Sequence, residues 1–568
     1  MSAQTQQLGH LLVNKGVISS DQLRLALQEQ QKNHQPLGRL LVSLGFLTEA
    51  IIRDVISENL GQESVDFSAI IIDPAAIKLI PKDIARRYLL LPLSIDLPIK
   101  QLTLAVADPD NIIALDQLRA LLKDEYTLVT QVASESDILR AIDQYYGFEL
   151  SIDGILHEIE PTDMEYQTLQ AGANEFSQPV VRLIDALLTE AVQQGASDIH
   201  FEPEHSFLRI RYRIDGVLRQ VRSLHKSFWP AMVVRMKVIS SMNIAETRAP
   251  QDGRISLRLS GRPIDFRVAS HPTTHGENLV LRILDRQKGI VPINQLGLDD
   301  AALTTMKLII AKPEGIILMT GPTGSGKTTT LYSVLNHVNT ESINIMTLED
   351  PVEYPIPLVR QTSVNEATKL DFVNGIRSMM RQDPDIILVG EIRDHPTAEM
   401  AFRAAMTGHQ VYSTLHTNSA IGAIPRLLDI GILPDIMAGN IIGIIAQRLV
   451  RVLCPHCKYA YRPDQGECTL LGLHNAQLDS GLTLYRATGC ELCRHQGYSG
   501  RRAIMELLKM DSDLDDLVAR RASIRDIKQA AKDKGFRPLA SDGLRRVLQG
   551  QTSLSEVARV VDLTDRIG

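Results

Sequence analysis

The sequence predicts an α/β protein of several domains. At 568 residues the chain is too long for a single hydrophobic core, so we expect three or more domains. Between residues 315 and 391, apolar runs that end in glycine-rich or acidic stretches alternate with helix-like segments, as in parallel strands joined by helices. Residues 61–147 and 179–285 also alternate strand-like and helix-like pieces. These observations favour an α/β multidomain architecture.

The composition excludes several classes of protein. The net charge of −7 and the pI near 6.1 argue against bulk nucleic-acid binding, and no uncharged apolar run is long enough to span a membrane. The N-terminus lacks the basic-then-apolar layout of a signal peptide. Five cysteines in so long a chain, four of them in CxxC pairs, indicate reduced thiols rather than a disulfide framework. We expect a cytosolic protein without a nucleic-acid partner.

Residues 1–60 contain an internal repeat with an offset of 29 residues. Each copy reads as a short helix, a turn at glycine and a second helix. A small helical docking domain whose leucines pack together is one interpretation. The repeated positions are Leu8-Gly9, Leu12-Val13, Gly16, Leu23, Leu27 and Gln30 in the first copy, and Leu37-Gly38, Leu41-Val42, Gly45, Ile52, Ile56 and Asn59 in the second.

Two further segments precede the centre of the chain. Residues 61–147 read as a small α/β domain. Residues 148–178 lack Lys and Arg and accumulate acidic side chains, which predicts a flexible acidic linker, although part of it would also fit an exposed helix face.

A second α/β domain is predicted for residues 179–288. Arginines alternate with apolar residues in its strand-like runs, as in Arg209-Ile-Arg-Tyr-Arg213. Isolated arginines on strands are usually solvated, but several of them ahead of the glycine-rich stretch at residues 321–328 favour a cationic wall that faces phosphate. Our candidates for that wall are Arg213, Arg254 and Arg267.

A phosphate-binding motif follows the apolar run at residues 315–320. The motif is G-P-T-G-S-G-K-T, and a helix-like segment comes after it. Its glycines let backbone N–H groups surround phosphate oxygens, and the helix N-terminus adds partial positive charge. Lys327 can reach the β- and γ-phosphates, and the hydroxyl of Thr328 can bind Mg²⁺. The expected ATP site comprises Gly321, Pro322, Thr323, Gly324, Ser325, Gly326, Lys327, Thr328 and Thr329.

Carboxylates and histidines follow the next strand-like runs. Glu349 and Glu353 end one run, and Glu391 ends another. Because ligands sit beyond the carboxyl ends of parallel strands, these acids can hold Mg²⁺ or orient the attacking water. His409 and His416 flank a further strand, which suggests a sensor of the γ-phosphate.

These motifs, in this order and spacing, resemble those of the secretion ATPases, the hexameric motors of type IV pilus assembly and type II secretion. The matching segments are G-P-T-G-S-G-K-T-T-T, T-L-E-D-P-V-E, R-Q-D-P-D-I-I-L-V-G-E-I-R-D and T-G-H-Q-V-Y-S-T-L-H-T-N. The resemblance implies a RecA-like core at 289–450, preceded by a PAS-like domain. It also implies that Glu349 or Glu353 positions the attacking water, that Glu391 supports magnesium and hydrolysis, and that His409 and His416 sense the nucleotide state. The choice of general base stays open.

The same resemblance implies the surroundings of the motor. The domain at 179–288 would cover the nucleotide of its own or a neighbouring subunit of a homohexamer. The partners would be an inner-membrane platform protein and a cytoplasmic-ring protein, so that the motor lies at the inner face of the cytoplasmic membrane.

The region 451–568 predicts a metal centre. Before it, residues 441–452 read as an apolar helix that carries Gln447, Arg448 and Arg451. Two CxxC pairs separated by 32 residues can supply four thiolates to a closed, structural zinc site. Beyond Arg501 we expect helices with a role in subunit contacts. The predicted zinc ligands are Cys454, Cys457, Cys490 and Cys493.

The N-terminal repeat is similar to the cyclic di-GMP-binding module of some pilus ATPases. Gln7 and Pro36 stand where that pattern begins with Arg, and Asn59 replaces its closing Gln. The loss of a guanidinium removes a donor suited to phosphate or guanine. The residues that the resemblance implies for this ligand are Gln7, Leu8, Gly9, Gln30, Leu37, Gly38 and Arg39.

The leading hypothesis is an ATP-hydrolysing hexameric motor for type IV pilus assembly or related type II secretion, with ATP, Mg²⁺ and Zn²⁺ as cofactors and cyclic di-GMP as a regulator. The alternatives are a type II secretion ATPase without second-messenger binding and a non-catalytic, nucleotide-dependent scaffold. A GTPase is disfavoured because no base-reading N-K-x-D segment is present.

Overall fold

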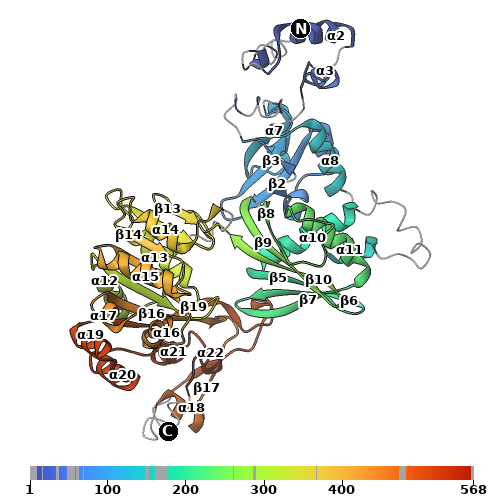
Figure 1. The fold of residues 1–568 in the computed structure, drawn as a ribbon. Helices are drawn as coiled ribbons and strands as arrows, with labels where there is room; N and C mark the ends of the chain where they lie inside the picture. Colours follow the sequence, from blue (N-terminus) through green and yellow to red (C-terminus); the bar gives the residue numbers. More distant parts are fainter. Residues whose placement is uncertain are drawn as a thin grey trace. The chain divides into compact units, whose positions relative to one another are not determined.

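The computed structural model forms two compact units, residues 1–287 and 288–568, which are described separately (Figure 1). It describes residues 9, 11–13, 15, 17–33, 37–47, 51, 55, 58, 63–67, 70–109, 111–146, 152–159, 177–259, 261–285, 290–365, 368–472 and 482–563. No helix within these ranges is both long and apolar enough to cross a membrane.

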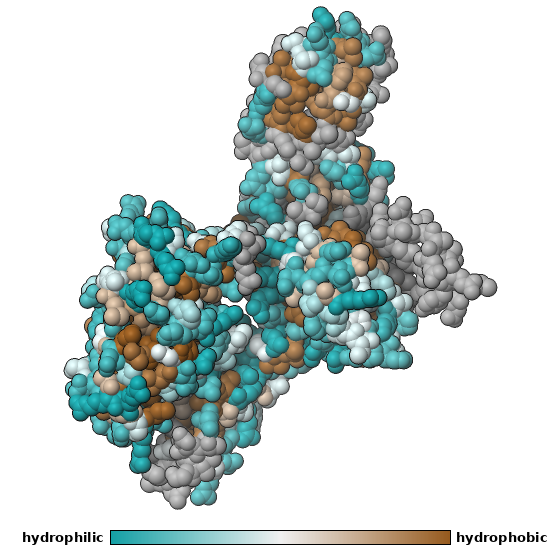
Figure 2. Space-filling model, in the orientation of Figure 1, coloured by the Kyte–Doolittle hydropathy of each residue, from teal (hydrophilic) through white to brown (hydrophobic). Residues whose placement is uncertain are grey.

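The N-terminal repeat folds around a small core of its own. Its elements include helices α2 (Ser20–Asn33) and α3 (Leu37–Ser43). Residues at equivalent positions of the two copies are buried together, namely Leu12 with Leu41, Ile18 with Leu47, and Ala26 with Val55. The 29-residue periodicity is therefore a periodicity of core positions. Apolar side chains also reach the surface of this part (Figure 2), where Leu25 is 48% exposed.

The predicted small α/β domain follows. Its sheet has the order β2-β3-β4, with an antiparallel β2–β3 pair and a parallel β3–β4 pair. The short strand β1 (Ile70–Ile71) instead adds to the edge of the next sheet, beside β8. The remaining elements are β2 (Leu90–Asp96), β3 (Gln101–Val106), β4 (Thr127–Val132), α5 (Pro74–Ile77), α6 (Lys82–Tyr88), α7 (Ile112–Leu121) and α8 (Glu135–Tyr145).

The segment predicted as an acidic linker contains a helix. Helix α9 (Ile152–Ile159) packs on α10 (Ser177–Gln193), and its Ile152 and Ile155 are buried in the core of the second domain. The apolar spacing of these isoleucines outweighs the acidic composition, so the linker prediction is wrong for residues 152–159. The rest of 148–178 up to Ser177 lies outside the described residues.

The second domain is a sheet, antiparallel except for the edge strand β1, with helices α10 and α11 (Trp229–Ile239) against its apolar face. Strict alternation explains this packing. In β6, Leu208, Ile210 and Tyr212 are fully buried, whereas the arginines between them point to the other face. The sheet order is β1-β8-β9-β10-β5-β6-β7. The strands are β5 (Ala196–Pro203), β6 (Phe207–Ile214), β7 (Val217–His225), β8 (Gln251–Leu259), β9 (Arg262–Thr273) and β10 (Gly276–Asp285).

Residues 288–568 are built on a seven-stranded sheet with the order β13-β12-β14-β15-β11-β16-β19. The strands are parallel except β19, which is antiparallel to β16. They are β11 (Gly315–Thr320), β12 (Ile345–Glu349), β13 (Arg360–Ser363), β14 (Ile386–Val389), β15 (Gln410–Leu415), β16 (Ile441–Leu453) and β19 (Tyr498–Lys509). The helices that accompany them are α12 (Asp300–Ile310), α13 (Lys327–Val338), α14 (Phe372–Met379), α15 (His395–Met406), α16 (Ala423–Ile430) and α17 (Pro434–Met437).

The helix predicted for residues 441–452 is wrong, because this segment is the strand β16. A continuous apolar run does not distinguish a buried helix from a buried strand by periodicity. β16 lies between β11 and β19, and its first seven residues are all buried. Its isoleucines favour the strand because β-branched side chains suit a sheet that is covered on both faces.

The C-terminal region completes this sheet rather than forming a separate helical segment. β19 extends from Tyr498 to Lys509, so the helices begin only at Ser512. One apolar core joins strand residues such as Leu348 to C-terminal residues such as Leu544. The other elements are β17 (Tyr459–Tyr461), β18 (Leu484–Arg486), α18 (Gln465–Leu471), α19 (Ser512–Ala519), α20 (Ile524–Asp533), α21 (Leu539–Leu548) and α22 (Leu554–Val560).

Candidate nucleotide site and metal centre

The phosphate-binding loop joins the buried strand β11 to helix α13. Gly324 and Gly326 have φ values of +78° and +86°, which favour glycine. The first-turn N–H groups of α13 have no intrahelical partners, and no side chain caps them. Thr328 and Thr329 are exposed, and the buried Oγ of Ser325 has no hydrogen-bond partner among the described residues. Open donors and hydroxyls in this arrangement fit the phosphates and magnesium of a nucleotide.

Lys327 is held over the loop by backbone carbonyls. Its Nζ donates to Gly321 O at 2.8 Å and to Pro322 O at 3.2 Å, and the residue is 9% exposed. Burial lowers the pKa of Lys327, while the charge of Glu391 acts in the opposite direction. The ammonium group therefore sits in the loop with carbonyl contacts that phosphate oxygens can replace.

Gln447 of β16 supports the phosphate-binding loop, a role that the sequence analysis did not predict. Its Nε2 donates to Ser325 O at 2.7 Å, and its Oε1 accepts from Thr330 Oγ1 at 2.8 Å. A Cβ on Gly326 would lie 2.8 Å from Gln447 Nε2, so this close approach requires glycine. The available signal was a buried amide within an apolar run, which is rare without a specific partner.

We expect Gln447→Leu to weaken ATP binding. The change removes both bonds that fix the loop, each of which contributes about 0.5–1.5 kcal/mol, so KM for ATP should rise roughly 5- to 100-fold. A matched control is Gln410→Leu, because Gln410 is also buried and its Nε2 bonds Ile310 O at 2.7 Å, at the opposite end of the sheet. Phosphate release measured against ATP concentration checks this. Equal changes in KM for both variants would reduce Gln447 to a packing residue.

Glu391 lies just beyond the carboxyl end of β14 and close to His416. Its carboxylate pairs with Arg393, and its Oε2 is 3.4 Å from His416 Nε2. Burial would raise the pKa of Glu391, but the hydrogen bond and charge of Arg393, with His416, hold it below the ordinary value. Because β14, β15 and β11 are neighbouring parallel strands, Glu391 lies at the same edge of the sheet as the phosphate-binding loop. Glu391 and His416 are therefore in contact at the edge of the sheet that carries the loop of Lys327.

Glu349 is satisfied inside the protein. The residue is 5% exposed, and its carboxylate accepts from Tyr332 OH at 2.5 Å, from Thr347 Oγ1 at 2.6 Å and from Gln361 Nε2 at 3.3 Å. Burial raises its pKa despite these donors. The Tyr332 hydroxyl also accepts from the N–H of Glu353, so the two acids share one tyrosine. In this arrangement Glu349 orders the loop that carries Glu353, and Glu353 is the less buried of the two.

The structure does not bring His409 to this site. His409 precedes β15, where its Nδ1 lies 3.0 Å from Ala404 O, whereas His416 follows the strand. Six residues of strand separate the two, which is about 20 Å. In the parallel sheet, the beginning of β15 aligns with the beginning of β11, and the phosphate-binding loop lies at the other end. The sequence suggests a γ-phosphate sensor role for both histidines, but the structure places only His416 at the edge of the sheet that carries the loop.

The predicted arginines form a row across the second domain's sheet. Arg254, Arg267 and Arg282 are successive cross-strand partners, and Asp198 and Arg213 continue the same row. Directly paired residues share a face, so all of these side chains leave the sheet on one side. Asp198 lies 3.2 Å from Arg282 and 3.6 Å from Arg213, and Arg254 is 61% exposed. Asp265 also pairs with Arg254 at 3.1 Å, so two carboxylates among four guanidinium groups leave this row with net positive charge.

The four cysteines of the CxxC pairs converge as predicted. Their Sγ atoms all lie within 4.8 Å of one another, with separations of 4.0 Å for Cys454–Cys490 and 3.7 Å for Cys457–Cys493. Four thiolates around zinc at 2.3 Å would be about 3.8 Å apart, so the geometry fits a tetrahedral zinc ion. The N–H groups of Cys490 and Gly497 point to Cys493 Sγ at 3.2 Å each. Although burial opposes them, these donors contribute to a Cys493 pKa of about 6, which suits a metal-bound thiolate.

We expect Cys454→Ser to release zinc and to lower the unfolding temperature, because the binding free energy of a structural metal is also folding free energy. Cys468→Ser is the matched control, since Cys468 is buried but lies outside the cluster. Metal analysis and thermal unfolding of the purified full chain check both. Less than half an equivalent of zinc in the parent protein would contradict a four-thiolate zinc site.

A phosphate-binding loop at the carboxyl edge of a mainly parallel sheet, with Lys327 in the loop and an ionised Glu391 at the same edge, defines a P-loop ATPase. The chain belongs to the type II/IV secretion system protein family, whose model matches residues 173–559. A second family model, the MshEN domain, matches residues 60–152.

Relatives match the chain from end to end. It is 40% identical to the type IV pilus assembly ATPase PilB of Myxococcus xanthus, covering 97% of this chain and 98% of the relative. It is 39% identical to type II secretion system protein E of Xanthomonas campestris, covering 99% of each. The solved structure of the Legionella pneumophila ATPase DotB covers 66% of this chain and 94% of its own at 21% identity, with a TM-score of 0.50, which shows a shared fold.

Proposed function

We propose that this chain is the ATP-hydrolysing motor of type IV pilus assembly, or of a related type II secretion machine. It works as a homohexamer on an inner-membrane platform protein, beside a cytoplasmic-ring protein, at the inner face of the cytoplasmic membrane. The supporting observation is the end-to-end match to a type IV pilus assembly ATPase, combined with a phosphate-binding loop that holds Lys327 and a carboxylate, Glu391, in contact with His416. The intact Lys327 and Glu391 argue against a non-catalytic scaffold.

The chemistry follows from the side chains at the loop. ATP binds with its β- and γ-phosphates against Lys327 and the N–H groups that begin α13. The Thr328 hydroxyl and Glu391 would hold Mg²⁺, which would neutralise phosphate charge. Glu353 or Glu391 orients the attacking water, and His416 reads the γ-phosphate through its contact with Glu391.

The arginine row supplies the remaining positive charge. Arg213, Arg254 and Arg267 approach the phosphates of a nucleotide bound by a neighbouring subunit, because a ring joins unlike faces of successive copies. Arginine suits this role since its planar fork binds phosphate in a bidentate manner.

Deletion of the gene in its own organism tests the biological assignment. We expect cells without surface pili, restored by the wild-type gene but not by one that encodes Lys327→Ala. Normal piliation with a loss of secreted proteins would assign the chain to type II secretion. Intact piliation together with intact secretion would contradict the proposal.

Cyclic di-GMP regulation is a second candidate, based on the resemblance of the repeat at residues 1–60 and supported by the MshEN match to the segment that follows it, residues 60–152. The structure describes only some of the residues implied for cyclic di-GMP. Gln7, Leu8, Pro36 and Asn59 lie outside the described residues, as does the side chain of Arg39. Leu37 is 3% exposed and belongs to the repeat's core, and a Cβ on Gly9 would meet Leu23 at 2.7 Å. Some of the apolar residues implied for ligand binding are therefore buried in the repeat's own core. Gln30 and Gly38 are half-buried.

Calorimetry on the full chain tests this regulation. We expect cyclic di-GMP to bind weakly and Gln7→Arg to tighten it roughly ten- to a hundredfold, because a charged hydrogen bond contributes about 1.5–3 kcal/mol. No heat at millimolar ligand in either protein would leave the repeat as a docking domain.

A further inference from the structure

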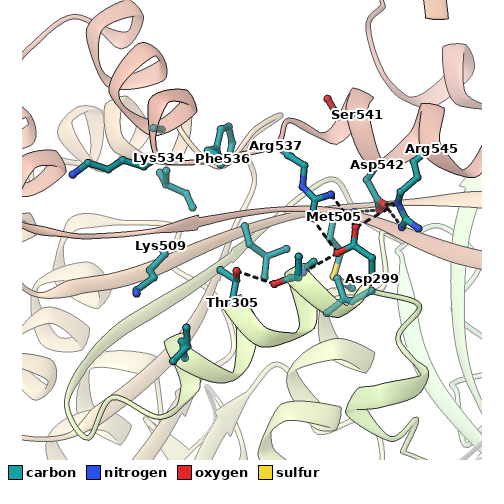
Figure 3. A pocket seen from close by; sticks show the side chains of 18 of the residues that line it. Asp299, Thr305, Met505, Lys509, Lys534, Phe536, Arg537, Ser541, Asp542 and Arg545 are labelled. Carbon is teal, nitrogen blue, oxygen red and sulfur yellow. Dashed lines mark hydrogen bonds and ion pairs between the residues drawn. The ribbon is translucent and has the colours of Figure 1, made fainter.

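A groove of about 630 Å³ runs along the free edge of β19. Helix α12 forms one wall and the segments from α19 to α21 form the other, with β19 between them (Figure 3). It shares no residue with the nucleotide site or the zinc cluster. The groove is therefore a separate surface of residues 288–568.

The edge of β19 offers backbone hydrogen-bonding groups to this groove. The N–H of Met510 donates to Ile442 O at 3.3 Å. Because backbone groups of an antiparallel pair alternate in direction, the N–H and C=O groups of Leu508 and Glu506 also point toward β16. Met505, Leu507 and Lys509 must then direct their N–H and C=O groups away from β16. The N–H of Met505 donates to Asp542 Oδ2 at 3.1 Å, which confirms that this alternate set of backbone groups points away from β16. Within the described ranges, no hydrogen bond engages the backbone of Leu507 or Lys509 beyond the ladder.

The walls carry apolar side chains on both sides of the edge. Leu308 of α12 is 52% exposed, and Leu298 lies on the same wall. Leu514 and Phe536 line the opposite wall. A strand added beside β19 would place alternate side chains against these two walls.

The charges at the groove favour an acidic occupant. Four cationic and two acidic side chains line it, and both acids are already used, since Asp299 pairs with Arg537 at 3.0 Å and Asp542 pairs with Arg545. Lys509 is exposed and forms no ion pair with any residue that the structure describes. Lys534 is held by Asp511 at 2.8 Å and by Asp513 at 2.5 Å, so the unpaired positive charge of the groove is that of Lys509 on its rim (Figure 3).

We propose that an extended, acidic segment of a separate partner protein binds this groove by adding as a strand to β19. The unpaired edge specifies an extended backbone, the apolar walls specify alternate apolar side chains, and the unpaired Lys509 specifies an acidic side chain beside it. A second copy of this chain fits less well. The other free edges of its two large sheets include β13, with the sequence RQTS, and β7, with VLRQVRSLH, which carry arginines rather than acids. This inference is independent of the nucleotide site.

Fluorescence polarisation of a labelled peptide, Val-Asp-Val-Glu-Val-Asp, titrated with the full chain tests the proposal. A peptide N-methylated at alternate residues keeps the side chains but cannot pair with a strand edge. We expect binding of the parent peptide, at least tenfold weaker binding of the methylated one, and slower hydrogen exchange at the Leu507 amide. Lys509→Glu should weaken binding about tenfold, whereas Lys307→Glu, an exposed lysine of α12 outside the groove, should not.

The outcomes separate the alternatives. No binding at millimolar peptide, equal binding of the methylated peptide, or equal effects of the two lysine variants would overturn the proposal. A change of assembly size in Lys509→Glu, measured by light scattering, would assign the groove to a second copy and also overturn it. Phosphate release should stay unchanged in Lys509→Glu, so a failure here leaves the ATPase assignment intact.

Discussion

We expect Lys327→Ala to abolish ATP turnover. The ammonium group is the buried cation of the phosphate-binding loop, and its contacts to Gly321 O and Pro322 O show that it reaches across the loop. Loss of about two charged hydrogen bonds to phosphate costs roughly 3–6 kcal/mol, or about two to four orders of magnitude in kcat/KM. Alanine favours the helix at this first position of α13, so the fold should persist.

Steady-state phosphate release measures this effect, with thermal unfolding as the check on the fold. Lys307→Ala is the control because this lysine is exposed on α12 and distant in sequence from the loop. Turnover of Lys327→Ala at the wild-type rate would mean that the nucleotide site is misassigned.

Glu391→Gln should retain ATP and hydrolyse it slowly. The amide keeps the shape and removes the charge that Arg393 and His416 now hold ionised. A carboxylate that acts on water or magnesium contributes roughly 10²–10⁴-fold, so kcat should fall by that factor while nucleotide affinity stays within a few-fold. The matched variant Glu399→Gln, on the exposed face of α15, should hydrolyse ATP normally.

Nucleotide binding and single-turnover hydrolysis separate these two effects. If Glu391→Gln lost ATP binding and hydrolysis together, Glu391 would be a structural ligand of the loop rather than a participant in the chemistry.

The sequence predicts the parts of this protein whose chemistry is local. The phosphate-binding loop needs a strand, glycines and a helix in immediate succession, and the CxxC pairs need only short spacing. Both are where the motifs place them. The row of arginines was also visible as alternation, because a strand fixes which side chains share a face.

Other features depend on contacts that are distant in the chain. Whether Ile441–Leu453 is a helix or a strand is decided by β11 and β19 on either side of it. The role of Gln447 follows from that pairing, since only a strand next to β11 brings its amide under the loop. His409 and His416 look equivalent in sequence, yet the direction of β15 puts them at opposite edges of the sheet. Glu349 is withdrawn from the site by Tyr332, seventeen residues earlier.

The most direct test of the central claim is a mixed-ring measurement. Subunits with Lys327→Ala lack a working phosphate-binding loop but keep the arginine row. Subunits with Arg267→Ala keep a working loop but lack an intact row. If the row completes a neighbour's site, each variant alone is inactive. Random rings from an equal mixture should then recover about one quarter of the wild-type phosphate release, because about one interface in four joins an intact loop to an intact row. Mixed rings as inactive as either variant alone would show that loop and row do not act together across a subunit interface, and would contradict the account.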